Sequence, residues 1–222
     1  MPLLLLLLPL LLWGECALCA ELRINSADEL IGFSENVSKG VDYSEITVFL
    51  DSDIDFSGKT FEPIGNYSNS FLGTFDGQGY TISNLVMNST SQYVGLFGYS
   101  EGTTIKNVVM DSSCFVTSYT DYSSGTTFIG SVIGYCYSGG EQCTILNTVN
   151  MANISFLGNS NKMDLNIGGI VGGLNPSKNN EAFLSNCANY GFISHRGTSD
   201  DTYIGGIVGK SYGYYQSSIT VI

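Results

Sequence analysis

The feature that most constrains the fold of this chain is an internal repeat. Four short apolar segments align with one another, namely Val94–Gly98, Gly130–Gly134, Gly168–Gly172 and Gly205–Gly209. Their last glycines, Gly98, Gly134, Gly172 and Gly209, are 36, 38 and 37 residues apart. A fixed period of this length is typical of a solenoid, a propeller or an array of small units.

An asparagine follows each of the first three segments at a nearly constant distance. Asn107, Asn147 and Asn186 end three similar short runs and are 40 and 39 residues apart. If each repeat forms one coil, coils stack at about 4.8 Å and like residues lie above like residues. We therefore expect the asparagines to form a ladder of amides, and the four glycines to lie where a neighbouring backbone comes close or φ is positive. The alternative is that all of them are ordinary turn residues.

The residues inside each repeat favour β-strands. Phe128–Ile133 and Tyr203–Val208 are short runs with β-branched residues, interrupted by glycine or serine. No helical apolar period is sustained after Ser89, which excludes the helical repeats of similar length. The polar links, such as Ser118–Thr127 and Gly158–Asn166, are long for the hairpins of a propeller blade. The sequence therefore predicts an all-β parallel β-helix, one coil per repeat.

The first part of the chain is interpreted as the start of such a solenoid. Ser26 and Glu29 match a capping box, which predicts a short amphipathic helix over residues 27–38 that covers the open end. A strand is expected at Ile46–Leu50. Two more short strands are expected within Gly73–Leu85, around a tight turn at Asp76–Gly77.

The N-terminus is typical of a secretory leader. Leu3–Trp13 contains only Leu, Pro and Trp, and small residues follow at Ala17 and Ala20. We expect residues 1–20 to be a signal peptide and the mature protein to be secreted or at the cell surface. No second apolar run approaches 18 residues, so the sequence predicts no transmembrane segment.

Export determines how the remaining modification sites are interpreted. Four N-x-S/T sequons are candidate glycosylation sites, at Asn36, Asn66, Asn88 and Asn153. In an oxidising compartment we expect a disulfide between Cys136 and Cys143, because a short loop with two glycines joins them. Cys114 and Cys187 belong to repeats two coils apart, so we expect them to be unpaired and largely buried. Cys16 and Cys19 leave with the leader.

Several segments resemble the GLUG-motif proteins. The segments that carry the resemblance are Phe71–Leu85, Val94–Gly98 and Ile105–Val108, preceded by Ala27–Leu30, Asp53–Asp55 and Pro63–Gly65. These are secreted or surface proteins, including adhesin-like proteins and some bacterial immunoglobulin A peptidases in which the motif lies outside the catalytic part. The resemblance implies a right-handed parallel β-helix at the cell exterior and no catalytic set. In the second repeat Ser131 stands where the first glycine of the motif is expected.

Charge and histidine content exclude several functional classes. Eight Lys and Arg face 20 Asp and Glu, for a formal net charge of −12, which argues against nucleic-acid binding. A single histidine, His195, disfavours histidine-based zinc sites and catalysis; we interpret it as a surface-loop residue. Asp51, Asp53 and Asp55 form a weak Ca²⁺ candidate on one strand face, the alternative being turn and strand-end residues. No cofactor and no catalytic residue are predicted.

Tyrosines give the most suggestive pattern for binding. They cluster in three places that the sequence assigns to loops or their borders: Tyr119 with Tyr122, Tyr135 with Tyr137, and Tyr212 with Tyr214 and Tyr215. Exposed tyrosine among Ser, Gly and Asn is typical of adaptable binding surfaces and suits stacking on sugars. Ordinary aromatic packing at coil corners explains the pattern equally well.

Two functional hypotheses follow from the sequence. The first is a non-catalytic, adhesin-like module that binds glycan or protein; the second is an extracellular polysaccharide lyase or hydrolase on the same scaffold. In either case the chain can be the N-terminal, non-catalytic part of a larger surface protein or peptidase. The expected organisation is a signal peptide (1–20), an N-terminal cap with the first coils (21–90) and GLUG-like repeats (91–222). Because the last repeat is incomplete, we expect self-association through an uncapped final coil.

Overall fold

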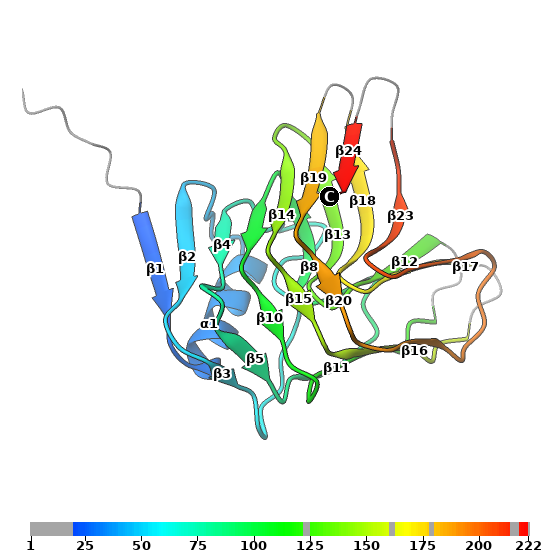
Figure 1. Ribbon diagram of the computed structural model, residues 1–222, viewed down its shortest axis with the longest axis horizontal. Coiled ribbons are helices and arrows are strands. Elements are labelled where there is room, and N and C mark those ends of the chain that lie inside the picture. The colour runs from blue at the N-terminus through cyan, green and yellow to red at the C-terminus, as the bar shows by residue number, and fades with distance from the viewer. Residues whose placement is uncertain (1–19, 122–124, 160–162, 178–179, 214–217, 222) are drawn as a thin grey trace, which may run out of the picture.

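The strands of this protein pair side by side and in parallel. The computed structural model describes residues 20–121, 125–159, 163–177, 180–213 and 218–221, which contain 24 strands and one α-helix. Every pairing between these strands is parallel. The protein is therefore all-β, as predicted, and its strands form five sheets (Figure 1).

Each sheet collects one strand from each repeat. The seven-stranded sheet contains β1 (Ala20–Ile24), β2 (Ile46–Leu50), β4 (Thr74–Asp76), β9 (Thr104–Lys106), β14 (Cys143–Leu146), β19 (Glu181–Ser185) and β24 (Ser218–Val221). The five-stranded sheet contains β3 (Ile54–Asp55), β5 (Thr81–Ser83), β10 (Val109–Met110), β15 (Val149–Asn150) and β20 (Ala188–Asn189).

The other three sheets have four strands each and are named here by their first strand. The β6 sheet contains β6 (Val86–Ser89), β11 (Phe115–Ser118), β16 (Asn153–Phe156) and β21 (Ile193–His195). The β7 sheet contains β7 (Tyr93–Val94), β12 (Gly125–Ile129), β17 (Met163–Gly168) and β22 (Thr202–Gly205). The β8 sheet contains β8 (Phe97–Glu101), β13 (Ile133–Ser138), β18 (Val171–Pro176) and β23 (Val208–Ser211).

The register of these sheets reproduces the alignment of the repeats. From β4 onward, the chain visits the five sheets in a fixed order and returns to the first after five strands; we call one such pass a coil. In the β7 sheet Ile129 pairs with Val94 on one side and with Ile167 on the other, and Ile167 pairs with Ile204. The four glycine-containing segments thus lie directly over one another.

The aligned glycines are required by the close approach of neighbouring coils. A Cβ built on Gly134 would lie 2.7 Å from the carbonyl oxygen of Gly98, and one built on Gly172 would lie 2.6 Å from that of Gly134. Neither distance leaves room for a side chain. None of the four aligned glycines (Gly98, Gly134, Gly172 and Gly209) has a positive φ. Of the two predicted reasons for these glycines, the close approach of a neighbouring backbone is therefore correct and a left-handed conformation is not.

One helix covers the N-terminal end of the stack. Helix α1 (Ala27–Ser38) has the predicted bounds, and the Ser26 hydroxyl accepts a hydrogen bond from the Glu29 amide at 3.3 Å. The Glu29 carboxylate accepts from the Asn25 amide instead of completing the standard capping box. Buried Phe33 packs its ring against Phe71 and Phe75 of the first coils, with centroids 5.7 and 6.4 Å away. Figure 1 shows α1 beside the strands of this end.

One predicted turn differs in the structure. The two strands expected within Gly73–Leu85 are present as β4 and β5, but they belong to different sheets and do not form a hairpin. The turn lies at Gly77–Tyr80, where the Tyr80 amide donates to the Gly77 carbonyl and Gln78 has a φ of +54°. The two predicted strands are thus confirmed, whereas the turn expected at Asp76–Gly77 lies at Gly77–Tyr80 and carries the chain around a coil.

Candidate binding surface

A row of aromatic side chains lies where the β7 sheet meets the β8 sheet. Because side chains alternate along a strand, residues in register point to the same face, so each sheet contributes one column. The β7-sheet column is Tyr93, Phe128, Asn166 and Tyr203, and the β8-sheet column is Tyr99, Tyr135, Gly173 and Lys210. We call these eight residues, with Tyr67 and Tyr212, the aromatic corner.

The first two coils fill the corner with ring pairs. Tyr93 and Tyr99 meet edge to face at 5.1 Å between centroids, and Phe128 and Tyr135 approach to 4.5 Å. Rings also touch between the coils, since Tyr93 is stacked on Phe128 at 5.7 Å and Tyr99 lies 5.3 Å from Tyr135. Such pairs contribute about 0.5–1.5 kcal/mol each beyond their buried area, so the row is rigid.

The third coil interrupts the row with a glycine and an asparagine. A Cβ on Gly173 would lie 2.5 Å from the Phe128 ring and 2.9 Å from the Tyr135 ring, so only glycine fits there. The ring of Tyr212 approaches this position, 5.9 Å from Phe128, and its hydroxyl accepts a hydrogen bond from Asn166 Nδ2 at 2.9 Å. Asn166 is fully buried, and its Oδ1 has no hydrogen-bond partner among the residues that the structure describes.

A cation closes the row on the fourth coil. Lys210 Nζ lies 3.7 Å from the centroid of the Tyr203 ring and 5.0 Å from that of Tyr212, both within cation–π range. The row is exposed at its two ends, where Tyr67 is 74% and Tyr203 38% exposed. Tyr99 and Phe128 in the middle are buried.

Two tyrosines of the corner, Tyr99 and Tyr212, are held neutral. Burial raises the pKa of the Tyr99 hydroxyl well above its ordinary value, and nearby tyrosines and Glu101 add to the effect. Burial also raises the pKa of Tyr212, although the charge of Lys210 and the hydrogen bond from Asn166 partly oppose it. The hydroxyls therefore stay protonated at physiological pH and can donate hydrogen bonds.

The sequence identified part of this surface and misplaced it. Tyr135 and Tyr137 lie in β13, not in a loop, because the chain continues as a strand directly after the glycine segment. Tyr119 is exposed just after β11, whereas Tyr122, Tyr214 and Tyr215 lie outside the described residues. Tyr93 and Phe128 were missed, but the signal was available: residues of the two columns lie one or two positions before the aligned segments or directly follow their last glycine.

The predicted asparagine ladder is present along the seven-stranded sheet. Asn147 Nδ2 donates to Asn107 Oδ1, and Asn186 Nδ2 donates to Asn147 Oδ1, both at 3.0 Å. All three asparagines have φ near +50°, the left-handed conformation that asparagine tolerates better than most residues. The predicted ladder and the alternative of ordinary turn residues are thus both correct, because the three asparagines turn the chain and also hydrogen-bond to one another.

A buried carboxylate forms the N-terminal end of the ladder. Asp76 Oδ1 accepts from Asn107 Nδ2 at 2.8 Å, and Lys106 Nζ lies 3.2 Å from Asp76 Oδ2. Burial raises the pKa of the Asp76 carboxyl, but the hydrogen bonds from Asn107 and the Gln78 amide and the charge of Lys106 outweigh it. The pKa therefore lies below the usual value and Asp76 is ionised at neutral pH.

The three carboxylates of the weak calcium candidate are engaged separately. Asp51 bonds to Arg23 at 2.8 Å, Asp53 accepts from the Thr81 amide, and Asp55 accepts from Asn84 and Ser57. Those hydrogen bonds lower the pKa of Asp55. Among the described residues, no three acidic, histidine or cysteine side chains are grouped so that they could hold a metal ion. The structure thus favours the alternative, in which they are strand-end residues.

The cysteines behave as the repeat spacing predicts. Cys136 and Cys143 form a disulfide, with 6.5 Å between their Cα atoms. Cys114 is free and buried, and Cys187 is free but only half-buried, which is more exposed than expected. Burial raises the pKa of both free thiols, so neither has the character of a reactive thiolate.

The remaining predicted sites are scattered over the surface. Asn36 and Asn88 are exposed, whereas the side chains of Asn66 and Asn153 accept backbone hydrogen bonds from Asn69 and Phe192. His195 lies at the end of β21, not in a loop, because this position stacks on Phe156, whose ring centroid is 5.5 Å away. The predicted signal peptide (1–20), including Cys16 and Cys19, lies outside the described residues except for Ala20. No helix within the described ranges is long and apolar enough to cross a membrane.

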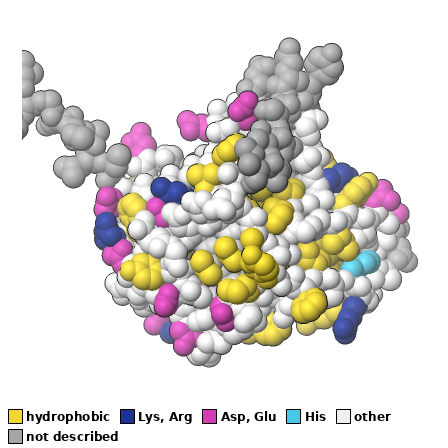
Figure 2. All heavy atoms as spheres, viewed as in Figure 1, with side chains coloured by type: hydrophobic (Ala, Val, Ile, Leu, Met, Phe, Trp, Pro, Cys, Tyr) yellow, Lys and Arg dark blue, Asp and Glu magenta, His cyan; other side chains and the backbone are white. Residues whose placement is uncertain are grey.

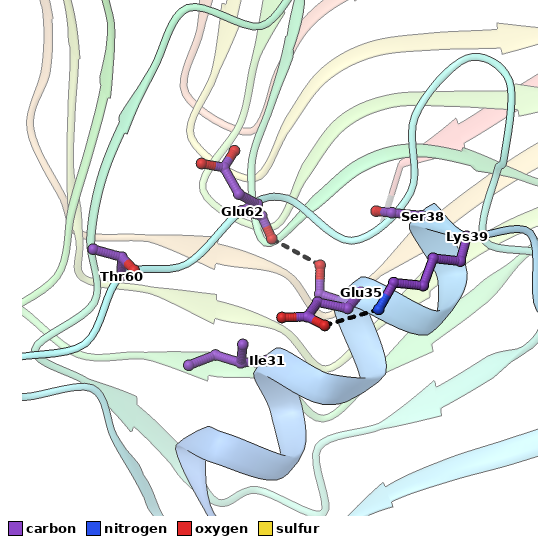
Figure 3. A pocket seen from close by; sticks show the side chains of 7 residues that line it. Ile31, Glu35, Ser38, Lys39, Thr60 and Glu62 are labelled. Carbon is purple, nitrogen blue, oxygen red and sulfur yellow. Dashed lines mark hydrogen bonds and ion pairs between the residues drawn. The ribbon is translucent and has the colours of Figure 1, made fainter.

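A cavity of about 320 Å³ lies between α1 and the loop that follows β3. Figure 3 shows Ile31 and the paired Glu35 and Lys39 on the helix side, and Thr60 and Glu62 on the loop side. The Ser34 hydroxyl donates to the Glu62 carbonyl at 2.8 Å and ties the helix to the loop. Since Glu35 and Lys39 are paired with each other and the cavity is open to solvent, it offers little to orient a ligand.

Comparisons with known proteins add one solved structure. No model of a known protein family matches this sequence, and no curated protein matches it. The solved structure is a crystal structure of a protein from Bacteroides ovatus, provisionally described as an immunoglobulin A1 protease. The two share 17% sequence identity with a TM-score of 0.46, over 90% of this chain and 76% of that one. At this level the likeness supports no statement about function.

Proposed function

We propose that this protein is a non-catalytic binding module of the cell exterior, and that it binds a glycan or protein ligand in the aromatic corner. The observation that carries the proposal is the register of the corner. Aromatic rings occupy both register positions on the first two coils, the ring of Tyr212 approaches the third, and Tyr203 with Lys210 occupies the fourth. Such a column is a continuous strip whose length grows with the number of coils.

The scaffold that we propose is a right-handed parallel β-helix with GLUG-like repeats. Five parallel sheets, visited in the same order on each pass, support it. Parallel crossover connections are right-handed in nearly all known proteins, which supports the hand. The stacked glycines and asparagines are the positions at which the sequence resembles the GLUG motif.

The chemistry of the corner suits binding better than catalysis. Its two columns contain tyrosine, phenylalanine, asparagine, glycine and one lysine, and neither contains a carboxylate. A hydrolase or lyase needs acids or bases positioned together at the reacting bond. Rigid aromatic rings with neutral hydroxyls and amides instead provide contact area and hydrogen bonds at low entropic cost.

An extracellular location is part of the proposal. The leader-like N-terminus supports it, and so does the Cys136–Cys143 disulfide, because disulfides persist in oxidising compartments. The exposed sequon asparagines Asn36 and Asn88 are accessible to a glycosylating enzyme.

The proposal is tested by measuring retention of purified protein on immobilised glycans and surface glycoproteins. We expect Tyr203→Ala to reduce binding about tenfold or more, since truncating an aromatic anchor removes stacking contacts of this size. Tyr190→Ala is the matched control, because Tyr190 is 75% exposed and lies beside the five-stranded sheet, away from the corner. Equal binding of Tyr203→Ala and wild-type protein to every ligand would reject the corner as the binding surface.

A second copy of the chain is a further proposed partner, bound through the final coil. Ile204 is 51% exposed, whereas its register partner Ile167 is fully buried by the coil above it. Residues 182–213 contain two basic and two acidic residues, so this end does not share the negative charge of the whole chain. In Figure 2, acidic side chains gather toward the N-terminal strands and hydrophobic ones over β10, β15 and β20.

Sedimentation at increasing concentration tests this association. We expect wild-type protein to dimerise, Ile204→Lys to stay monomeric, and Val41→Lys, at a 47% exposed site near α1, to dimerise normally. A monomeric wild type at all concentrations would reject the association, as would equal dimerisation of Ile204→Lys.

A further inference from the structure

We propose that the ligand of the aromatic corner is an uncharged, extended glycan that runs along the stack from coil to coil. This inference rests on the proposed binding function and specifies its substrate class. Three features of the corner support it: the spacing of its rings, the hydrogen-bonding groups beside them and the near absence of charge.

The spacing of the rings matches that of a linear sugar chain. Neighbouring parallel strands lie about 4.8 Å apart, a distance close to the length that one sugar ring adds to an extended glycan. The columns contribute positions from four coils, so the row covers about 14 Å, which is room for about three rings. A protein ligand has no reason to repeat at the coil spacing, whereas a glycan of identical units repeats in step with it.

The orientation of the rings also fits sugars. Tyr93 and Phe128 are stacked with an interplanar angle of 12°, so their planes form a continuous wall across two coils. At the open end, the ring of Tyr203 is 38% exposed and carries Lys210 over one face. The apolar faces of sugar rings pack on aromatic faces as other apolar groups do, while their hydroxyls point to the side.

Polar groups beside the rings can bind hydroxyls. The Tyr212 hydroxyl accepts from Asn166 and keeps its own hydrogen for donation to a ligand oxygen. Asn166 is fully buried, so its amide positions the Tyr212 hydroxyl from beneath the row and does not itself reach a ligand. Sugar hydroxyls both donate and accept, so they match the Tyr212 hydroxyl.

The charge of the molecule disfavours acidic glycans. Lys210 is the only charged residue among the ten that define the corner, and its ammonium group already lies over Tyr203. The formal net charge of the chain is −12, so a polyanion is repelled as it approaches. Uncharged glycans escape this repulsion, and they need no cation from the protein.

Calorimetric titration with defined oligosaccharides tests the inference. The probes are uncharged β-1,4-linked oligomers of glucose, N-acetylglucosamine, xylose and mannose, from two to about six units, and acidic oligomers of galacturonate and hyaluronan. We expect at least one uncharged series to bind, with affinity that rises to about four units and then levels off. The acidic series should bind at least about tenfold more weakly.

Variants assign the binding to the corner. Tyr203→Ala should weaken binding about tenfold or more, Tyr203→Phe should bind nearly as wild type because the ring is retained, and Tyr190→Ala should have no effect. Circular dichroism confirms that each variant is folded.

The outcomes separate this inference from the proposed function. If an acidic glycan or only a protein binds, and Tyr203→Ala removes that binding, the corner remains a binding surface but the substrate class is wrong. If Tyr203→Ala leaves all binding unchanged, both proposals fail. If affinity for an uncharged series does not depend on its length, the glycan does not run along the coils and the inference is overturned.

Discussion

Replacing Asn147 tests how the coils are held in register. Asn147 lies in the middle of the amide ladder, where its Nδ2 donates to Asn107 and its Oδ1 accepts from Asn186. It also has a φ of +50°. The variant Asn147→Ala removes both hydrogen bonds and places alanine in the left-handed conformation, whereas Asn147→Gly removes the bonds but relieves the backbone.

The magnitude follows from these two effects. A hydrogen bond contributes about 0.5–1.5 kcal/mol net, and the exposed position of Asn147 places each bond at the low end, so both together contribute about 1–2 kcal/mol. The left-handed conformation costs alanine about 1 kcal/mol more than asparagine or glycine. We expect Asn147→Ala to lower the free energy of unfolding by about 2–3 kcal/mol and Asn147→Gly by about 1 kcal/mol less than that.

Urea unfolding of unglycosylated protein, followed by far-ultraviolet circular dichroism, measures these differences. Asn88→Ala is the control, since Asn88 is exposed on β6 and should change stability by less than about 0.5 kcal/mol. If Asn147→Ala is as stable as Asn88→Ala, the ladder does not hold the coils together. If Asn147→Gly is as unstable as Asn147→Ala, the backbone conformation has no part in the effect.

Three further predictions concern the packing, charge and covalent structure of the stack. Gly172→Ala should lower the free energy of unfolding by more than about 2 kcal/mol, because its Cβ would lie 2.6 Å from the Gly134 carbonyl oxygen. Gly206→Ala is the control and should be nearly neutral, because a Cβ there meets no described atom within 4 Å. Urea unfolding of the two variants measures the difference between them. Because the pKa of Asp76 is lowered in the folded protein, its carboxylate stabilises the fold above the unfolded pKa of about 3.9, and this stabilisation is lost as pH falls through the folded value. When the free energy of unfolding is measured from pH 7 to pH 2, Asp76→Asn should therefore lose less stability than the wild type. An equal loss of stability in the two proteins would contradict this assignment. Reducing the Cys136–Cys143 disulfide should lower the free energy of unfolding by about 2–3 kcal/mol. Thermal unfolding with and without reductant measures this loss. An unchanged midpoint of unfolding would show that the loop is already ordered without the disulfide.

The periodic features of the fold were predictable from one sequence. Four glycine segments and three asparagines recur at one spacing, and in a stack of coils equal spacing means direct contact. The sequence therefore predicted the Asn107–Asn147 hydrogen bond and the close packing at Gly134. Local signals predicted helix α1 with the same bounds, because a cap and an amphipathic pattern are properties of the segment itself.

Features that depend on where the chain turns were not predictable. Asp76 and Gly77 have the composition of a hairpin turn, but the parallel stack carries the next strand into another sheet. Tyr135 and Tyr137 were expected in a loop or at its border, whereas both lie within the strand β13 (Ile133–Ser138). The aromatic corner depends on the angle at which two sheets meet, and no single repeat contains that information. Aligning all four repeats would have revealed its two columns.

Measuring binding and cleavage on the same polysaccharides distinguishes a binding module from an enzyme. Wild-type protein and Tyr203→Ala are incubated with the panel of uncharged and acidic glycans, with and without Ca²⁺, and both retained protein and released sugar ends are measured. We expect wild-type protein to be retained by an uncharged glycan, Tyr203→Ala to be retained far less, and neither to release sugar ends. Release of sugar ends by the wild-type protein would contradict a non-catalytic module.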